Sequence, residues 1–158
     1  MKSILHLISS PRGDASISIK LGRAIVNQLQ QKYPGSNVKE VNLAAQDVPH
    51  LDASHLQSFF TPEVQQSNAD HEAIKFSNEA VDQLMNADII VIGCPMYNFT
   101  IHSSLKAWID QVTRAGQTFR YSENGSEGLV VGKKVYLAVA SGGVYSSGPY
   151  QPYDFVVP

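Results

Sequence analysis

A short loop that follows an apolar run has the residue types that point most directly to ligand chemistry. Residues 89–94 (Ile-Ile-Val-Ile-Gly-Cys) predict a strand buried on both faces, and residues 95–99 (Pro-Met-Tyr-Asn-Phe) follow directly. Pro95 cannot continue a ladder, so we expect the backbone to leave the sheet at the strand's carboxyl end, where open α/β sheets bind ligands. A thioether, two aromatic rings and a carboxamide there suit a flat aromatic ligand with a polar rim. Core packing of Met96 and Phe99 is the alternative interpretation.

A serine-containing loop near the N-terminus is the second candidate site. Residues 9–15 (Ser-Ser-Pro-Arg-Gly-Asp-Ala) supply turn formers before a helix that we expect to begin at Ser16 or Ser18. Unpaired N–H groups and the helix dipole converge at such a point and favour an anion, and the hydroxyl of Ser10 can add a donor. Simple capping of the helix by Ser16 or Ser18 is the alternative. The loop matches neither the GxGxxG fingerprint nor the Walker pattern.

The third candidate is a glycine pair in residues 141–145 (Ser-Gly-Gly-Val-Tyr), after an expected strand at residues 134–140. Adjacent glycines let the backbone approach a ligand closely, although such pairs also serve as plain turns. All three loops follow strands that we expect to be parallel. A 2-1-3-4-5 strand order would bring them together at one crevice.

The rest of the chain alternates strands and helices, which predicts a parallel sheet with helices on both faces. Residues 44–68 are expected to be a loop with room for one short helix. Asn124-Gly125 predicts the turn of a small hairpin between residues 119–121 and 128–131. The other expected strands are residues 3–8 and 38–43, and the expected helices run from Ser16 or Ser18 to Tyr33, over residues 72–85 and over residues 103–114. Because no further helix and strand follow residue 140, we expect a single domain, residues 1–158, that is truncated at its C-terminus.

Composition narrows the class of protein. A length of 158 residues with 43% hydrophobic and 16% charged residues is typical of one globular domain. The net charge of −2 gives no reason to expect nucleic acid or an anionic membrane as a partner. No apolar stretch approaches the roughly 20 residues needed to span a bilayer. A single cysteine and the lack of a signal-peptide pattern predict a cytoplasmic protein.

Other chemistries find little support in the sequence. Cys94 lies at a strand end, but no arginine follows at the spacing of a phosphatase loop, so a small buried hydrophobe is the favoured interpretation. The GxSxG elbow of a hydrolase does not occur. The five histidines show no ligand-like spacing with Cys94, and we expect no metal. Trp108 is expected in the core or in a dimer contact.

Taken together, the three loops resemble those of the FMN-dependent NADH-azoreductases, a family of flavodoxin-like quinone and azo-dye reductases. The similarity runs through nearly the whole chain, and Pro-Met-Tyr-Asn-Phe with the later Phe-Arg-Tyr and Glu-Asn-Gly is a specific signature. One departure is Ala140-Ser141, where relatives often carry Ser-Arg. The matching segments are Ser10 with residues 16–18, then residues 95–99, 115–121, 123–129 and 142–143.

The resemblance implies a flavodoxin-like, doubly wound parallel sheet of five strands that here lacks its last helix and strand. It also implies FMN as cofactor. The phosphate would be held by Ser10, Ser16, Ile17 and Ser18. The isoalloxazine would be bordered by Met96, Tyr97, Asn98, Phe99, Ala140, Ser141, Gly142 and Gly143. Asn98, Phe99 and Tyr121 are the candidates for residues next to the substrate.

The implied activity is an FMN-dependent NADH:quinone oxidoreductase that passes hydride from NADH through the flavin to quinones and azo compounds. Since the cofactor supplies this chemistry, no side chain needs to be a nucleophile or a metal ligand. The resemblance also implies a homodimer with its active site at the subunit interface. The alternative is a flavodoxin-type electron carrier that NADH does not reduce directly, although a net charge of −2 gives little electrostatic steering for such a carrier.

Overall fold

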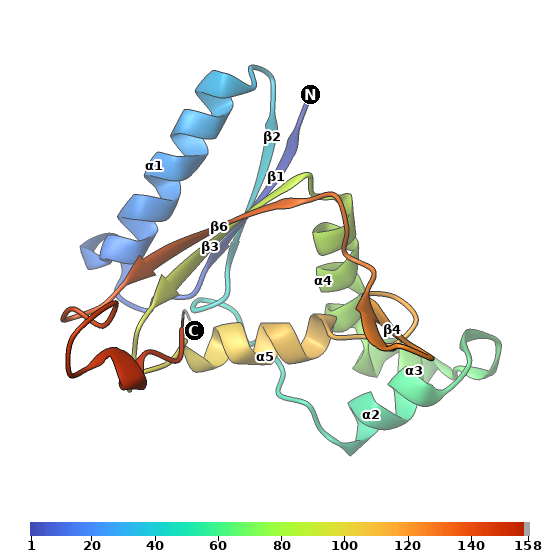
Figure 1. Cartoon of the computed structure of the whole chain (residues 1–158). Coiled ribbons are helices and arrows are strands. Elements are labelled where there is room, and N and C mark those ends of the chain that lie inside the picture. The colour runs from blue at the N-terminus through green and yellow to red at the C-terminus, as the bar shows by residue number, and fades with distance from the viewer. Residues whose placement is uncertain (157–158) are drawn as a thin grey trace. The chain divides into compact units, whose positions relative to one another are not determined.

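The structure is a computed structural model that describes residues 1–156 (Figure 1). The chain divides into two compact units. The first contains residues 1–47, 87–106 and the C-terminal part from Lys133 onward. The second contains residues 48–86 and 107–132. In the described part of the chain, no helix is both long enough and apolar enough to cross a membrane.

The first unit contains a four-stranded parallel sheet in the order β2-β1-β3-β6 (Figure 1). This is the 2-1-3-4 part of the predicted order, and no fifth strand joins the sheet within residues 1–156. β6 is therefore an edge strand in the described structure, with Val135 and Leu137 about half exposed. The strands are β1 (Ser3–Ile8), β2 (Asn37–Asn42), β3 (Ile89–Pro95) and β6 (Lys134–Ala140).

The expectation that β3 would end before Pro95 is wrong by one residue. Pro95 lies opposite Ala140 in the register, and the next amide, Met96 N, donates to Ala140 O at 2.8 Å. Proline lacks only its own N–H donor, so it is tolerated as the last residue of a strand. The chain leaves the sheet at Met96, so the loop still begins at the carboxyl end of β3.

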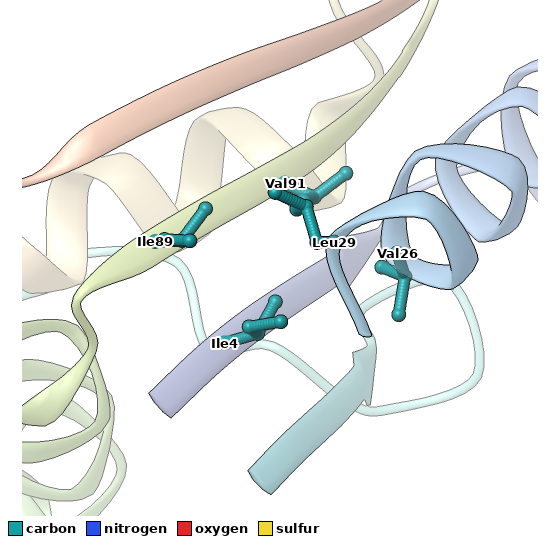
Figure 2. Packing of buried hydrophobic residues seen from close by; sticks show 5 residues of the cluster. All are labelled: Ile4, Val26, Leu29, Ile89 and Val91. Carbon is teal, nitrogen blue, oxygen red and sulfur yellow. The ribbon is translucent and has the colours of Figure 1, made fainter. Parts of the chain in front are cut away.

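Helix α1 (Ile17–Lys32) covers the sheet of the first unit. Its Val26 and Leu29 pack against residues of β1 and β3, as Figure 2 shows. Burying an aliphatic side chain of this size contributes about 1.5–3 kcal/mol, so the cluster anchors the helix on the strands. The helix ends before Tyr33, because Pro34 disfavours helical backbone in the residue before it. The buried cluster consists of Ile4, Val26, Leu29, Ile89 and Val91.

The second unit contains α2 (Ala53–Phe60), α3 (Asn68–Ala73), α4 (Lys75–Asn86) and the hairpin β4 (Phe119–Ser122) and β5 (Gly125–Gly128). Helix α5 (Ser103–Val112) crosses the division between the units. Within the second unit, the Arg114 guanidinium lies 3.9 Å from the centre of the Phe59 ring and donates to Ser77 Oγ at 2.7 Å. This buried cation is thus held by an aromatic face and a hydroxyl.

The hairpin differs from its prediction by a shift toward the N-terminus. Ser122 pairs with Gly125, so Glu123 and Asn124 form the two-residue turn, and β5 ends at Gly128 instead of continuing to Val131. Gly125 has a φ of +106° at the first position of β5. A glycine takes this conformation freely, which explains why it follows the turn. The predicted helix 72–85 is also interrupted at Ile74, between α3 and α4.

Candidate functional site

Three loops of the first unit meet in one cavity of about 370 Å³ at the carboxyl ends of β1, β3 and β6. Nine of the twelve residues predicted to bind the cofactor line this cavity, although they come from three distant parts of the sequence. They are Ser10, Ser16, Ile17, Ser18, Met96, Tyr97, Ala140, Ser141 and Gly142. Arg12, Pro95 and Val139 complete the lining.

The other predicted residues lie close to this cavity or in the second unit. Gly143 lines a neighbouring cavity of about 660 Å³ that shares Met96 and Ser141 with the first. Asn98 lines a third cavity of about 780 Å³, which shares Tyr97. Phe99 follows Asn98 in the chain. Tyr121 belongs to β4 in the second unit, where its side chain is 76% exposed.

The serine loop combines helix capping with buried hydroxyl groups. Ser16 is the N-cap of α1, and its Oγ accepts a hydrogen bond from Ile19 N at 3.4 Å. The Oγ atoms of Ser16 and Ser18 lie 3.0 Å apart, and Ser10 Oγ lies 3.5 Å from Tyr97 Oη. The alternative of helix capping is therefore correct for Ser16, but capping does not account for the other two serines, which are buried beside the cavity.

This donor set fits a phosphate. The cavity includes the start of a 16-residue helix, whose N–H groups and dipole favour negative charge. Hydroxyls that can rotate and the side chain of Arg12 add donors without an opposing carboxylate among the residues that line the cavity. The thioether of Met96 and the ring of Tyr97 lie in the same lining and suit an aromatic ring system. The residues present therefore fit FMN.

One hydrogen bond and one close backbone approach join the ends of β1 and β3. Ser9 Oγ donates to Gly93 O at 2.6 Å. A β-carbon added at Gly93 would lie only 3.3 Å from Leu7 O, so a larger residue would crowd the neighbouring strand. The small residue and the buried hydroxyl thus place the first and second loops side by side.

Tyr97, which lines the cavity, and Thr100 close a tight turn after β3. Tyr97 N donates to Thr100 O at 2.9 Å, and Thr100 N donates to Tyr97 O at 3.1 Å. The two residues between them have positive φ angles, +50° for Asn98 and +67° for Phe99. A type I′ turn requires this backbone at both central positions, where glycine and asparagine are usual. A phenylalanine there is strained, and strained residues cluster at functional sites.

The other titratable groups considered in the sequence give no competing chemistry in the described structure. Cys94 is buried, and burial raises the pKa of its thiol to about 11, so it is a neutral packed side chain at pH 7. Within residues 1–156, no group of three or more His, Cys, Asp and Glu side chains is arranged to hold a metal ion.

Aromatic residues of the C-terminal segment also contribute to this region. Tyr145 belongs to the third candidate loop, whereas the sequence did not indicate Tyr153. Tyr145 lines the 660 Å³ cavity together with Gln151 and Asp154. Tyr145 and Tyr153 both contact the ring of Phe99. The aromatic residues Tyr150, Tyr153 and Phe155 were the available signal, but no helix or strand pattern accompanies them.

A parallel sheet whose first loop leads into a helix N-terminus, with a cavity at the carboxyl ends of its strands, is typical of α/β proteins that bind a phosphorylated ring compound. A family model for the flavodoxin-like fold matches residues 2–158, and the chain belongs to this family. The flavodoxin-like fold expected from the sequence is thus confirmed.

Individual relatives agree with this assignment. The chain is 49% identical over 155 residues to an FMN-dependent NADH:quinone oxidoreductase of Herminiimonas arsenicoxydans, covering 98% of this chain and 76% of the relative. It is 46% identical over 158 residues to the FMN-dependent NADH:quinone oxidoreductase of Rhizobium johnstonii, covering 100% of this chain and 77% of the relative. The chain is thus shorter than these proteins.

Solved structures give the same result. The azoreductase from Bacillus anthracis str. Sterne superimposes with a TM-score of 0.91 at 29% identity, covering 99% of this chain and 77% of that one. An FMN-dependent NADH-azoreductase from Bacillus anthracis str. Ames Ancestor, solved in complex with FMN, superimposes with a TM-score of 0.87 at 27% identity and the same coverage. The resemblance to the azoreductases is therefore confirmed.

Proposed function

We propose that this protein is an FMN-dependent NADH:quinone oxidoreductase that also reduces azo compounds. The proposal rests on one observation: three loops that are far apart in the sequence line the same cavity. This cavity has hydrogen-bond donors for a phosphate and side chains that can pack against a flat ring. The relatives named above carry the same activity in their names. When bound, FMN would supply the redox chemistry by accepting hydride from NADH and delivering it to the second substrate.

The protein's own residues would bind the FMN and orient its ring system. Ser10, Ser16, Ser18 and the N–H groups at the start of α1 would hold the phosphate. Main-chain N–H groups at Gly142 and Gly143, together with the Asn98 carboxamide, would donate to the polar edge of the ring system and favour negative charge there. Donors fixed in place by a turn need no reorganisation when that charge develops.

The ring would be bordered by Met96, Tyr97 and the turn that follows Ala140. The ring of Phe99 would border the space in which NADH and then the quinone stack in turn. A single space used by both substrates requires the first product to leave before the second substrate binds, so the kinetics would be ping-pong.

We further propose that the protein acts as a homodimer to which the β4–β5 hairpin contributes Tyr121. An isolated two-stranded hairpin is marginally stable in water, yet every residue of β4 and β5 except Phe119 is exposed. A second copy of the chain would cover it and bring Tyr121 to the substrate space of the partner. Light scattering coupled to size exclusion should then give twice the mass of 17.3 kDa, and a monomer would refute this part of the proposal.

The activity is tested by adding FMN to the purified protein and following NADH oxidation with and without a quinone. We expect oxidation that requires FMN and quinone together, and bleaching of an azo dye under the same conditions. A second measurement, made without oxygen, distinguishes a reductase from an electron carrier of the flavodoxin type. NADH alone should bleach the yellow bound flavin of a reductase, whereas a carrier would stay yellow until a partner reductase is added.

A further inference from the structure

The ring of Phe99 is held by residues about fifty positions further along the chain. Its centre lies 5.6 Å from the centre of the Tyr153 ring at a tilt of 42°. It lies 6.1 Å from the centre of the Tyr145 ring in an edge-on arrangement of 72°. The main chain is held as well, because Phe155 N donates to Phe99 O at 3.2 Å. Two ring contacts and one main-chain hydrogen bond from the C-terminal segment thus converge on Phe99.

The backbone at Phe99 makes this convergence informative. A φ of +67° disfavours a side chain with a β-carbon, and glycine would occupy the position without strain. A strained residue persists when its surroundings over-determine it, and here Tyr153 and Phe155 supply the surrounding contacts. The strain therefore indicates that the ring itself has a use at this position.

The aromatic group lies at the rim of the candidate site. Tyr145 contacts Phe99 and also lines the 660 Å³ cavity together with Met96 and Gly143. Phe99 remains 46% exposed as a residue although two rings pack against it. A ring that neighbouring side chains hold in place, and that is still open to solvent, can stack on a flat ligand with little loss of conformational entropy.

We infer that Tyr153 is a positioning residue that fixes the Phe99 ring as one wall of the acceptor space and thereby favours quinones with two fused rings over quinones with one. The inference rests on the proposed function. A fixed Phe99 ring offers more stacking area to a larger planar acceptor. A mobile ring would weaken the stacking of two-ring quinones more than that of one-ring quinones. Tyr153 itself need not touch substrate or cofactor.

The test compares kcat/KM for 2-methyl-1,4-naphthoquinone with kcat/KM for 1,4-benzoquinone in the FMN-loaded protein. Tyr153→Ala should lower the two-ring to one-ring ratio about three- to tenfold, the effect expected for one aromatic contact. Tyr153→Phe keeps the ring and should leave the ratio within twofold of wild type. Tyr150→Ala is the matched control, because Tyr150 lies in the same segment and packs on Tyr145 instead of Phe99.

A second readout needs neither cofactor nor activity. In the flavin-free protein, the NMR signals of the Phe99 ring should move in Tyr153→Ala and stay in place in Tyr153→Phe, because a neighbouring ring current is lost in the first and kept in the second. Phe99→Leu identifies the signals by their disappearance.

The outcomes separate the two proposals. Wild-type protein that is folded but shows no FMN-dependent NADH oxidation would overturn the proposed function and acceptor selection together. If the wild type is active, three results with Tyr153→Ala would overturn only the positioning role. These are an unchanged ratio, an equal fall in kcat/KM for both quinones, or weaker FMN binding. Phe99 signals that do not respond to Tyr153→Ala would also overturn it.

Discussion

Gly22 on α1 lies directly against the imidazole of His6 on β1: a β-carbon added at Gly22 would stand 2.5 Å from His6 Nε2. The same imidazole is buried, and its Nδ1 lies 3.1 Å from Glu40 Oε2 on β2. Helix α1 can therefore pack closely on the sheet, because Gly22 leaves room for the His6 ring.

Gly22→Ala should therefore destabilise the protein although alanine favours helix. The added methyl group would have to displace a packed ring, and overpacking of this kind costs about 1–3 kcal/mol. Chemical denaturation measures the change. Gly128→Ala is the control, since no atom lies within 4 Å of a β-carbon there, and its effect should be much smaller. Equal effects at the two glycines would contradict the close approach.

The stability of the protein should depend on the protonation of His6. Burial lowers the pKa of His6 below its ordinary value of 6.5, and the nearby Glu40 only partly opposes this, while Arg23 lowers the pKa further. Because the unfolded chain binds this proton more readily, the free energy of unfolding should fall as the pH drops through about 6.5. His6→Gln removes the titrating group, so its stability should change less than that of wild type between pH 7.5 and pH 5.5. Identical pH slopes would refute this.

The positive φ of Phe99 predicts a difference between two truncations. Phe99→Ala and Phe99→Gly both remove the ring, and each should lower kcat/KM for the two-ring quinone about tenfold, the equivalent of 1.4 kcal/mol. Only glycine relieves the backbone, so Phe99→Gly should be more stable than Phe99→Ala by about 1 kcal/mol in thermal or chemical denaturation. An alanine variant as stable as the glycine variant would show that the position is unstrained.

The two roles of Ser16 can also be separated. Ser16→Ala removes the helix cap and the hydroxyl, and should cost about 1 kcal/mol of stability. Ser16→Gly keeps most of the capping effect, so its stability should lie within a few tenths of a kcal/mol of wild type. Both variants lack the proposed phosphate donor and should weaken FMN binding about tenfold by fluorescence titration. Unchanged affinity in the glycine variant would restrict Ser16 to capping.

The parts of the fold that were predictable are those with strong local patterns. The apolar runs at residues 3–8 and 89–94 predict strands and form the mostly buried β1 and β3, while the run at residues 134–140 forms β6, whose first four residues are exposed. Ser16 lies where a cap was expected. The strand ends then follow from the parallel arrangement. This arrangement predicts that the three loops meet, and the resemblance to the azoreductases implied the individual residues, nine of which line one cavity.

The parts that could not be predicted depend on contacts across the chain. Turn chemistry would have placed glycine at the centre of the Tyr97–Thr100 turn, and nothing local indicates that Phe99 adopts positive φ there. Its contact with Tyr153 joins positions far apart in sequence, within a segment that has no regular pattern. The hairpin register differs because the Asn124-Gly125 pair predicts a turn centred on itself, whereas Gly125 begins β5.

The convergence of the three loops on one FMN molecule is tested most directly by titrating FMN into the isotope-labelled protein and following the amide signals of Ser18, Tyr97 and Gly142. All three should shift, saturate at one equivalent of FMN and report the same Kd. Signals that respond at only one loop, or that give different dissociation constants, would contradict a single site built from all three.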